Sequence, residues 1–320
     1  MPVHSIIPMR ATLHGAFSRN ATPILTIESG DTVVFQTLDA GWNLGALWAG
    51  YPPDKERKFE PRDPVLDNGH CLCGPIQISG AKSGMTLEIR IGEIVPGGWG
   101  WTAGGGWPCE VNERLGMVES TVTLEWNIDA TEMKARNQYG HEVSLRPFLG
   151  VMGMPTDEEG LLPTPPPRRT GGNLDCKELI SGTTLFLPIE VDGGLFSAGD
   201  GHGVQGDGEV SVTALECPME RAELTFYLRP DITLKMPRAR TPEGWLAFGL
   251  HPDLNEAAYI ALEGILDLMT EQYELDRLQA VALASLTVDL RITQIVNGVK
   301  GVHAVLPNNA VRNLKPRQQC

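Results

Sequence analysis

Short strand-forming runs, each preceded by a polar turn with glycine, recur through the first two thirds of the chain and constrain its fold most. The turns at 28–31, 83–86 and 181–184 each lead into a run rich in Val, Ile, Leu and Phe, residues typical of half-buried strands. Further strands are expected at 23–27, 120–126, 209–216 and 222–228. This repetition favours a β-sandwich, in which strands cross a shared core again and again.

The spacing of apolar residues changes near the C-terminus. Asp253 and Glu256 have the spacing of a capping box, and apolar residues follow them at helical intervals. A second helix is expected over 274–286, and a strand over 288–293. We therefore predict a mainly-β chain, a jelly-roll-like β-sandwich with a smaller α+β part at its C-terminus.

A proline-rich stretch at 161–170 separates two halves of the sequence. Prolines favour extended backbone and remove amide donors, so this stretch is expected to connect the halves. The chain has 320 residues, more than one compact core usually serves. We expect an N-terminal β-rich domain over 1–160 and a C-terminal part over 171–320 with the metal-site motif, with sheets able to run through both.

The charge of the chain limits its partners. Acidic residues number 40 against 26 basic ones, and the net charge of −14 opposes approach to phosphate backbones and anionic membranes. No segment has the roughly twenty apolar residues of a membrane span, and the N-terminus lacks an export signal. We expect a cytoplasmic protein that binds neither nucleic acid nor membranes.

Carboxylate and imidazole groups gather in a glycine-rich run. Asp200 and His202 flank a single glycine, so both side chains can turn toward one cation. Asp175 follows an earlier Gly-Gly pair, and glycines let the backbone bend closely around a ligand. The pattern indicates a divalent-metal site; the alternative is an ordinary turn in which aspartate bonds backbone amides.

Such a site suits hydrolysis. A bound divalent cation promotes ionisation of water and polarises a carbonyl group. Glu209 or Glu216 would take the proton of the water and pass it to a leaving nitrogen. Zinc is the first choice of metal, and the mixed oxygen and nitrogen donors also suit manganese or calcium.

The run 171–209 resembles the central signature of the acetamidase/formamidase family. It contains the GGN-x-D start, the LPI-x-V strand, the LFS-x-GD-x-H turn and the QGDGE ending of that signature. The stretches 23–31 and 74–81 resemble other strands of the family. The resemblance implies a β-sandwich-based fold and metal-dependent hydrolysis of formamide, acetamide or related small neutral amides to a carboxylate and ammonia or an amine.

The resemblance also suggests roles for individual residues. The expected metal ligands, or their immediate neighbours, are Asp175, Asp200, His202 and His70. The expected proton carriers are Glu209 and Glu216. The expected substrate-binding residues are Asn173, Gln205, His14 and Trp107.

Two departures from the family pattern concern the substrate. His14 is followed by Gly15 where the family has His-Trp, and Met85 stands where the family has an acidic residue. A changed entrance favours a bulkier or cyclic amide, including lactams. The loop 99–107 has three tryptophans among glycines and is expected to cover a pocket or to form a subunit contact in a homo-oligomer.

Two other functions remain open from the sequence. A cysteine-nucleophile amidase would use Cys176 or Cys73, although neither stands in a known nucleophile motif and the six cysteines are expected to be free thiols. A metal- or sugar-binding β-sandwich without catalytic activity is the second alternative.

Overall fold

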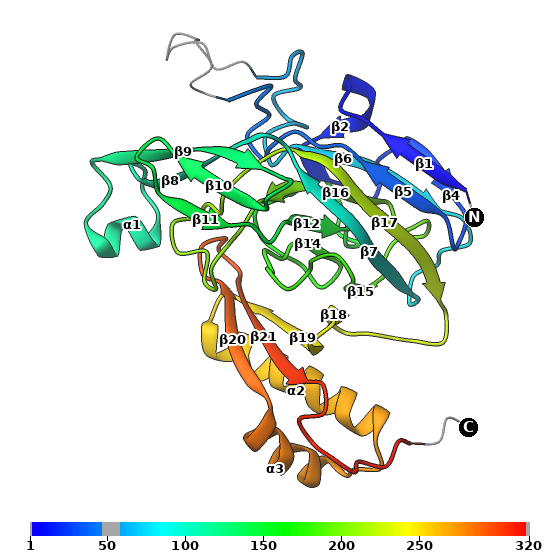
Figure 1. Ribbon diagram of the computed structural model, residues 1–320. Coiled ribbons are helices and arrows are strands. Elements are labelled where there is room, and N and C mark those ends of the chain that lie inside the picture. Colours follow the sequence, from blue (N-terminus) through cyan, green and yellow to red (C-terminus); the bar gives the residue numbers. More distant parts are fainter. Residues whose placement is uncertain (1, 47–57, 318–320) are drawn as a thin grey trace.

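The structure is a computed structural model that describes residues 2–46 and 58–317. Most of its regular elements are strands, and its two longer helices lie at the C-terminal end (Figure 1). The predicted mainly-β class with a small α+β C-terminal part is therefore confirmed.

The largest sheet contains three strands that follow the predicted glycine turns. Gly30, Gly84 and Gly182 all have positive φ, the backbone conformation that glycine adopts without steric cost. The strands after them are β5, β7 and β15, and all three lie in one nine-stranded sheet. Its order is β1 (Val3–Ile6), β5 (Thr32–Phe35), β17 (Met219–Arg229), β7 (Thr86–Pro96), β15 (Thr184–Pro188), β18 (Arg238–Arg240), β19 (Gly244–His251), β21 (Lys300–Pro307) and β20 (Asp289–Gln294).

A second sheet packs against the first and carries most of the candidate site. Its order is β14 (Gly171–Asn173), β12 (Phe148–Gly153), β16 (Phe196–His202), β6 (Leu72–Ile78) and β2 (Leu13–His14), with β4 (Leu25–Ile27) also paired to β6. Phe196 of this sheet meets Phe35 and Phe226 of the larger sheet, with ring centroids 6.5 and 5.0 Å apart. These edge-to-face contacts join the apolar faces of both sheets into one core.

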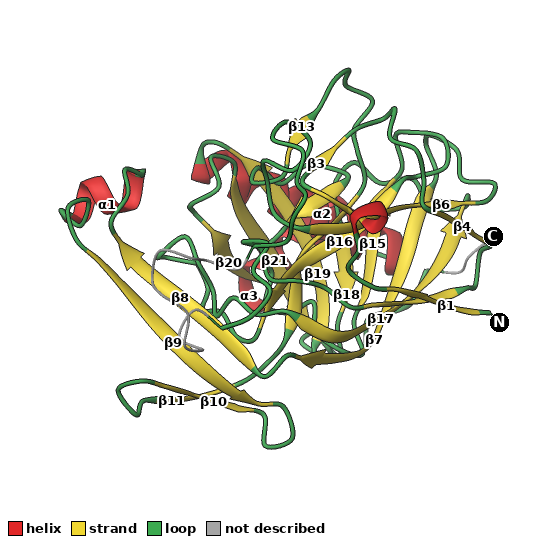
Figure 2. Cartoon of the chain, turned by 90° about the horizontal axis from the view of Figure 1, so that it is seen from above, coloured by secondary structure: helices red, strands yellow, loops and turns green. Residues whose placement is uncertain are grey.

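Two small sheets complete the β structure. The four-stranded one has the order β11 (Glu142–Ser144), β10 (Lys134–Asn137), β9 (Thr121–Asp129) and β8 (Trp99–Gly105), and it extends to one side together with α1 (Glu110–Leu115) (Figure 2). The other pairs β13 (Leu162–Pro163) with β3 (Ala16–Phe17), and a short 3-10 helix, η1, spans Arg10–Thr12. Strands from both sides of the proline-rich stretch thus alternate in the same sheets; the division at 161–170 stays a prediction.

The C-terminal part packs two helices against the edge of the large sheet. Asp253 caps α2 (Leu254–Gln272) by accepting hydrogen bonds from two backbone amides, as expected. The reciprocal capping box occurs instead at α3 (Arg277–Thr287), between Asp276 and Gln279. Within the described ranges, none of the helices is both long and apolar enough to cross a membrane.

One of the predicted strands is wrong. Residues 209–216 form a loop, in which Glu209 and Val212 have φ of 45° and 73°, outside the range of extended backbone. The alternation of apolar and polar residues there imitates a strand, while only Glu216 makes isolated bridges, to Trp101 and His202. The runs at 23–27 and 32–35 do form strands, β4 and β5, which lie in different sheets.

The contact between α2 and β19 depends on Gly249. A Cβ at this position would lie 1.9 Å from the backbone oxygen of Ala257 and 2.5 Å from the backbone nitrogen of Ala261. We expect Gly249→Ala to destabilise the protein by about 1 to 3 kcal/mol, because the helix must move away from the strand. Urea unfolding would measure this, with Gly98→Ala as the control, since no atom lies within 4 Å of a Cβ there. An equal midpoint for both variants would contradict the prediction.

Candidate active site

Three neighbouring strands bring the predicted site residues together. Asn173 ends β14, Gly150 lies in the middle of β12, and Asp200 and His202 lie at the end of β16. The register aligns Val151 with Asn173 on one side and Phe148 with His202 on the other. Two residues beyond β14, Asp175 is held in the same row, because its backbone N–H donates to the carbonyl oxygen of Gly150 at 3.2 Å.

Gly150 provides the space in which these side chains meet. A Cβ at this position would lie 2.5 Å from Asp200 Oδ2, 2.7 Å from Asp175 Oδ1 and 2.8 Å from His202 Cε1. Any larger residue would therefore occupy the position where the two carboxylates and the imidazole converge. The sequence analysis missed Gly150, although a glycine inside an apolar strand is a signal for such a close approach.

The converging groups have the composition of a metal site. Asp175, Asp200 and His202 each offer a ligand atom within 4.8 Å of the others, and so do His202, Glu209 and Glu216. His202 Nε2 lies 3.4 Å from Asp200 Oδ1 and 3.5 Å from Glu216 Oε2. All five side chains are buried, with at most 5% of each exposed.

Several of these buried atoms have no hydrogen-bond partner within the described part of the chain. They are Asp175 Oδ1, His202 Nδ1 and Glu216 Oε2. Buried polar atoms are normally satisfied, and an unsatisfied group in a native structure calls for a ligand or a functional explanation. Carboxylate oxygens and imidazole nitrogens are common ligands of divalent metals, so the residues present fit a divalent cation.

The backbone is strained at three of these acids. Asp175, Asp200 and Glu209 have φ of 49°, 58° and 45°. Residues other than glycine rarely adopt positive φ, and each such residue costs on the order of 1 kcal/mol. The pairing of β16 holds Asp200, and the backbone hydrogen bond to Gly150 holds Asp175. Strained residues of this kind are concentrated at functional sites.

Burial and mutual repulsion shift the ionisation of the cluster. Burial, together with the charge of Asp200, raises the pKa of Asp175 to about 8. Burial alone would raise the pKa of Asp200 as well, but the neighbouring imidazole of His202 holds it at about 2. Burial disfavours the charged form of His202, yet Glu216 and Asp200 raise its pKa well above the ordinary value. The cluster therefore needs positive charge among its carboxylates.

Ionisation of Glu209, at the edge of this inner group, is also disfavoured. Burial and the nearby Asp175 raise its pKa well above the ordinary value. Asn297, from the turn between β20 and β21, donates to Asp175 Oδ2 at 2.7 Å and to Glu209 Oε2 at 3.5 Å. Sequence analysis missed Asn297, because a Val-Asn-Gly turn more than 80 residues away carries no sign of this contact.

A cavity of about 300 Å³ opens onto the cluster. Its lining includes several of the predicted site residues and two that were not predicted as site residues, Trp101 and Asn297. The predicted ones are His70, Asn173, Asp200, His202, Glu209 and Glu216. His70 faces the cavity with its ring fixed by a 2.9 Å hydrogen bond between Nδ1 and Thr164 Oγ1. Trp101 is fixed by donating from Nε1 to the buried Asp39 at 2.8 Å.

The amide side chains of the predicted site are anchored on one side. Asn173 donates from Nδ2 to the carbonyl oxygen of Pro165 at 3.1 Å, and Gln205 donates from Nε2 to that of Asp175 at 2.7 Å. Asn173 Oδ1 and Gln205 Oε1 are buried without a hydrogen-bond partner among the residues the structure describes. Of these two side chains, Asn173 lines the cavity.

Like Gln205, two further predicted substrate-binding residues lie outside the cavity lining. His14 bonds Ala16 O at 2.8 Å and Ser197 Oγ at 2.9 Å through its two ring nitrogens, and burial lowers its pKa to about 4. Trp107 lies beyond the end of β8, where its carbonyl oxygen accepts from Asn112. The tryptophan that lines the cavity is Trp101.

The cysteines do not have the properties of nucleophiles. The five in the described ranges are free thiols, and Cys320 lies outside those ranges. Burial raises the pKa of Cys73 to about 12, and burial together with Glu178 raises the pKa of Cys176 well above its ordinary value. Neutral, buried thiols are poor nucleophiles, so neither is suited to attack a substrate.

Fold and site together define a mainly-β protein with a buried carboxylate–imidazole pocket of the kind found in metal-assisted hydrolases. The sequence profile of the Acetamidase/Formamidase family matches residues 157–236, which contain most of this pocket. The acetamidase of Mycolicibacterium smegmatis is 48% identical over an alignment that covers 47% of this chain and 51% of that protein. The chain thus spans about half the length of this relative.

Solved structures extend the similarity to nearly the whole chain. An acetamidase from Bacillus halodurans superposes with a TM-score of 0.80 at 27% identity, over 95% of this chain and 97% of that one. A gamma lactamase from Delftia acidovorans shares the fold alone, with a TM-score of 0.61 at 17% identity over 99% of this chain and 100% of that one. In sequence and in fold the chain is thus similar to the acetamidase/formamidase family. The acetamidases among these relatives are amide hydrolases, enzymes for carbon–nitrogen bonds other than peptide bonds.

The geometry around Gly150 gives a sharp test of the site. We expect Gly150→Ala to lower amide hydrolysis by about 100-fold or more, because displaced supporting groups alone cost 10- to 100-fold at such sites. Steady-state release of ammonia would measure the loss. Gly104→Ala is the matched control in another strand, where the nearest atom to a Cβ is 3.7 Å away. Full activity of Gly150→Ala in a folded protein would show that the reacting groups lie elsewhere.

Proposed function

We propose that this protein hydrolyses small neutral amides, with a divalent metal, in the cavity lined by Asp200 and His202. The observation that supports this most is the convergence of two carboxylates and one imidazole on the space that Gly150 leaves free. Amide hydrolysis adds the hydroxyl group of water to the acyl carbon, breaks the C–N bond and delivers a proton to the leaving nitrogen. The products are a carboxylate and ammonia or an amine.

Asp175, Asp200 and His202 would hold the cation, with His70 and Glu216 at its edge. When bound, the cation supplies Lewis-acid chemistry, promoting ionisation of water and polarising a carbonyl oxygen. His70 lines the cavity and suits a ligand role in the tautomer whose Nδ1–H donates to Thr164, because that tautomer leaves the Nε2 lone pair available. Zinc is the first choice, with manganese and calcium as alternatives for this oxygen-rich set.

Glu209 and Glu216 would carry the protons. Both carboxyl groups line the cavity and lie beside His202. Asn297 orients Glu209, and the backbone pairing of Glu216 with Trp101 on one side and His202 on the other fixes the position of Glu216. A carboxylate in this place can accept the proton of the attacking water and return it to the nitrogen that leaves.

The walls of the cavity favour a small uncharged substrate. The acids around it repel carboxylate substrates, whereas a primary amide has no charge to oppose. Asn173 Oδ1 is a free buried acceptor on the wall and would bond the N–H of a bound amide. Formamide, acetamide and related linear amides fit these conditions, and the fold shared with a gamma lactamase makes cyclic amides the alternative to test.

We also infer that the enzyme acts in the cytoplasm as a homo-oligomer. The net charge of −14 favours solubility and disfavours binding to nucleic acid or anionic membranes. Leu278 and Leu286 of α3 expose 79% and 81% of their surfaces, which suits burial in a subunit contact.

Metal removal tests the proposal directly. Treatment with a strong chelator should reduce ammonia release to a small fraction, and adding zinc, manganese or calcium in separate samples should identify the metal that restores it. Asp200→Asn should lower both metal content and activity, the activity by about 100-fold or more. Asp192→Asn is the control, since this carboxylate is exposed and bonds only Lys82 and Ser83.

The outcomes separate the alternatives. Activity that survives complete metal removal would favour a cysteine nucleophile and sink the metal proposal. Metal binding with no release of ammonia from any linear amide or lactam would indicate a protein that binds metal or sugar without catalysis.

A further inference from the structure

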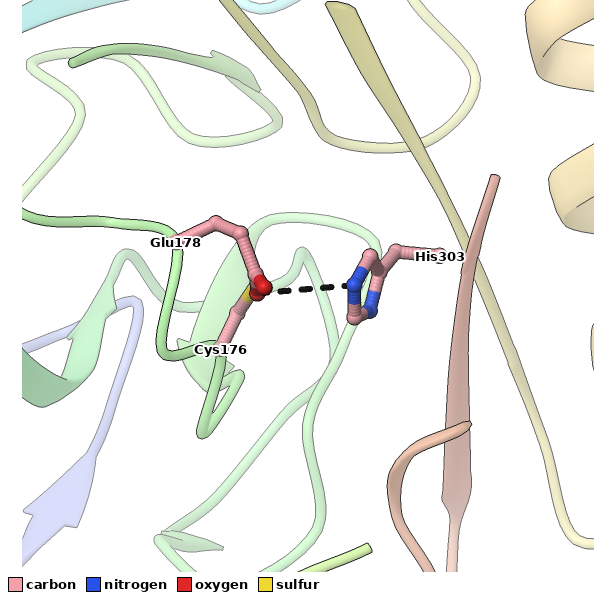
Figure 3. A group of neighbouring side chains, drawn as sticks. All are labelled: Cys176, Glu178 and His303. Atoms are coloured by element: carbon pink, nitrogen blue, oxygen red, sulfur yellow. Dashed lines mark hydrogen bonds and ion pairs between the residues drawn. The ribbon is translucent and has the colours of Figure 1, made fainter. Parts of the chain in front are cut away.

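A second group of metal-ligating side chains lies outside the cavity. Cys176 and Glu178 come from the turn after β14, and His303 comes from the middle of β21, so residues far apart in sequence meet (Figure 3). Glu178 Oε2 lies 3.3 Å from Cys176 Sγ and 3.4 Å from His303 Nε2. One ligand atom from each side chain lies within 4.8 Å of the others.

The imidazole of His303 is prepared for a ligand. Its ring is fully buried, and Nδ1 is fixed by a 2.8 Å hydrogen bond with Thr293 Oγ1. Nε2 has no hydrogen-bond partner among the described residues and faces the sulfur and the carboxylate. Histidines that ligate metals typically donate their other ring N–H to a neighbouring acceptor, and the hydroxyl oxygen of Thr293 can accept this bond.

The donor set selects the class of cation. A thiolate, an imidazole and a carboxylate together favour zinc and exclude magnesium and calcium, which prefer oxygen ligands alone. Zinc bonds of about 2.3 Å to sulfur and about 2.0 Å to nitrogen or oxygen place tetrahedral ligands about 3.5 Å apart. The measured 3.3 and 3.4 Å separations match that spacing.

The surrounding charges leave one oxygen of Glu178 open. Arg291 Nη1 lies 2.8 Å from Oε1, while Oε2 is the oxygen directed at Cys176 and His303. Arg291 also pairs with Asp207, which pairs with Lys177, so the two carboxylates Glu178 and Asp207 balance these two cations. A divalent cation bound to Sγ and Oε2 would replace the thiol proton, and the thiolate would balance one of its two charges.

We propose that Cys176, Glu178 and His303 form a second, structural metal site for a cation of the zinc class. The site joins the turn that carries Asp175 to strand β21. Asn297, which bonds the carboxylate of Asp175, belongs to the turn of the same β20–β21 hairpin. The cation would therefore fix the backbone of the turn that carries Asp175, while Asn297 fixes the Asp175 side chain.

The test separates the two sites by variants and by spectroscopy. The double variant Asp200→Asn/His202→Asn removes two of the three proposed ligands of the cavity cation, and the purified protein is then stripped and titrated with zinc. We expect one equivalent of zinc to bind per chain, and none after adding Cys176→Ser. With cobalt in place of zinc, a thiolate-to-cobalt absorption band in the near ultraviolet should appear in the double variant. That band should disappear with Cys176→Ser and persist with the control Cys109→Ser, a half-buried thiol elsewhere in the chain.

The result that overturns the proposal is equally defined. Absence of the thiolate band in the double variant would show that the three side chains form only a hydrogen-bond network, in which Cys176 donates to Glu178. If Cys176→Ser does not fold, Glu178→Gln and His303→Asn should still reduce zinc stoichiometry by one equivalent. Unchanged stoichiometry in both variants would also refute the site. Neither result depends on turnover, so failure of the catalytic proposal leaves this test intact.

Discussion

The structure depends most on one electrostatic problem, the gathering of buried carboxylates around the backbone of Gly150. Four acids and one histidine share this space with almost no access to solvent. Like charges in a medium of low polarity repel strongly, and an uncompensated buried charge costs several kcal/mol. His202 offsets part of this repulsion, and a divalent cation would offset more. A site with this composition is stable only when positive charge occupies its centre.

The sheet supplies the rigidity that this arrangement needs. Three adjacent strands fix the backbones of Asn173, Gly150 and Asp200 by paired hydrogen bonds, so the side chains cannot separate to relieve repulsion. The same pairing holds the positive φ of Asp200, and further strain lies at Asp175 and Glu209 in the loops after β14 and β16. Packing of the two large sheets through Phe196 supports the strands from behind. The stability of the packed core thus maintains a local arrangement of charges that would be unstable by itself.

The site residues that lie within one continuous motif were predicted from the sequence, whereas some that lie in distant segments were not. The motif between 171 and 209 contains Asp175, Asp200, His202 and Glu209, because glycines and acids alternate there visibly. Gly150 and Asn297 come from two other segments, and pairing of distant strands brings them to the site. Trp101, which lines the cavity, belongs to the tryptophan stretch 99–107 that was expected to cover a pocket or form a subunit contact. The strand expected at 209–216 failed for a related reason: periodicity records side-chain order but not the positive φ at Glu209 and Val212.

The C-terminal hairpin gives the α+β part a role beyond covering the sheet edge. Its turn provides Asn297 to the carboxylate of Asp175, and its strand β21 provides His303 to the neighbours of Cys176. Asp175 and Cys176 are consecutive, yet their side chains join different clusters. The short turn after β14 therefore contributes Asp175 to the oxygen-rich donor set of the cavity and Cys176 to the sulfur-containing set. The thiolate limits the second set to cations of the zinc class, whereas the oxygen-rich set also suits manganese or calcium.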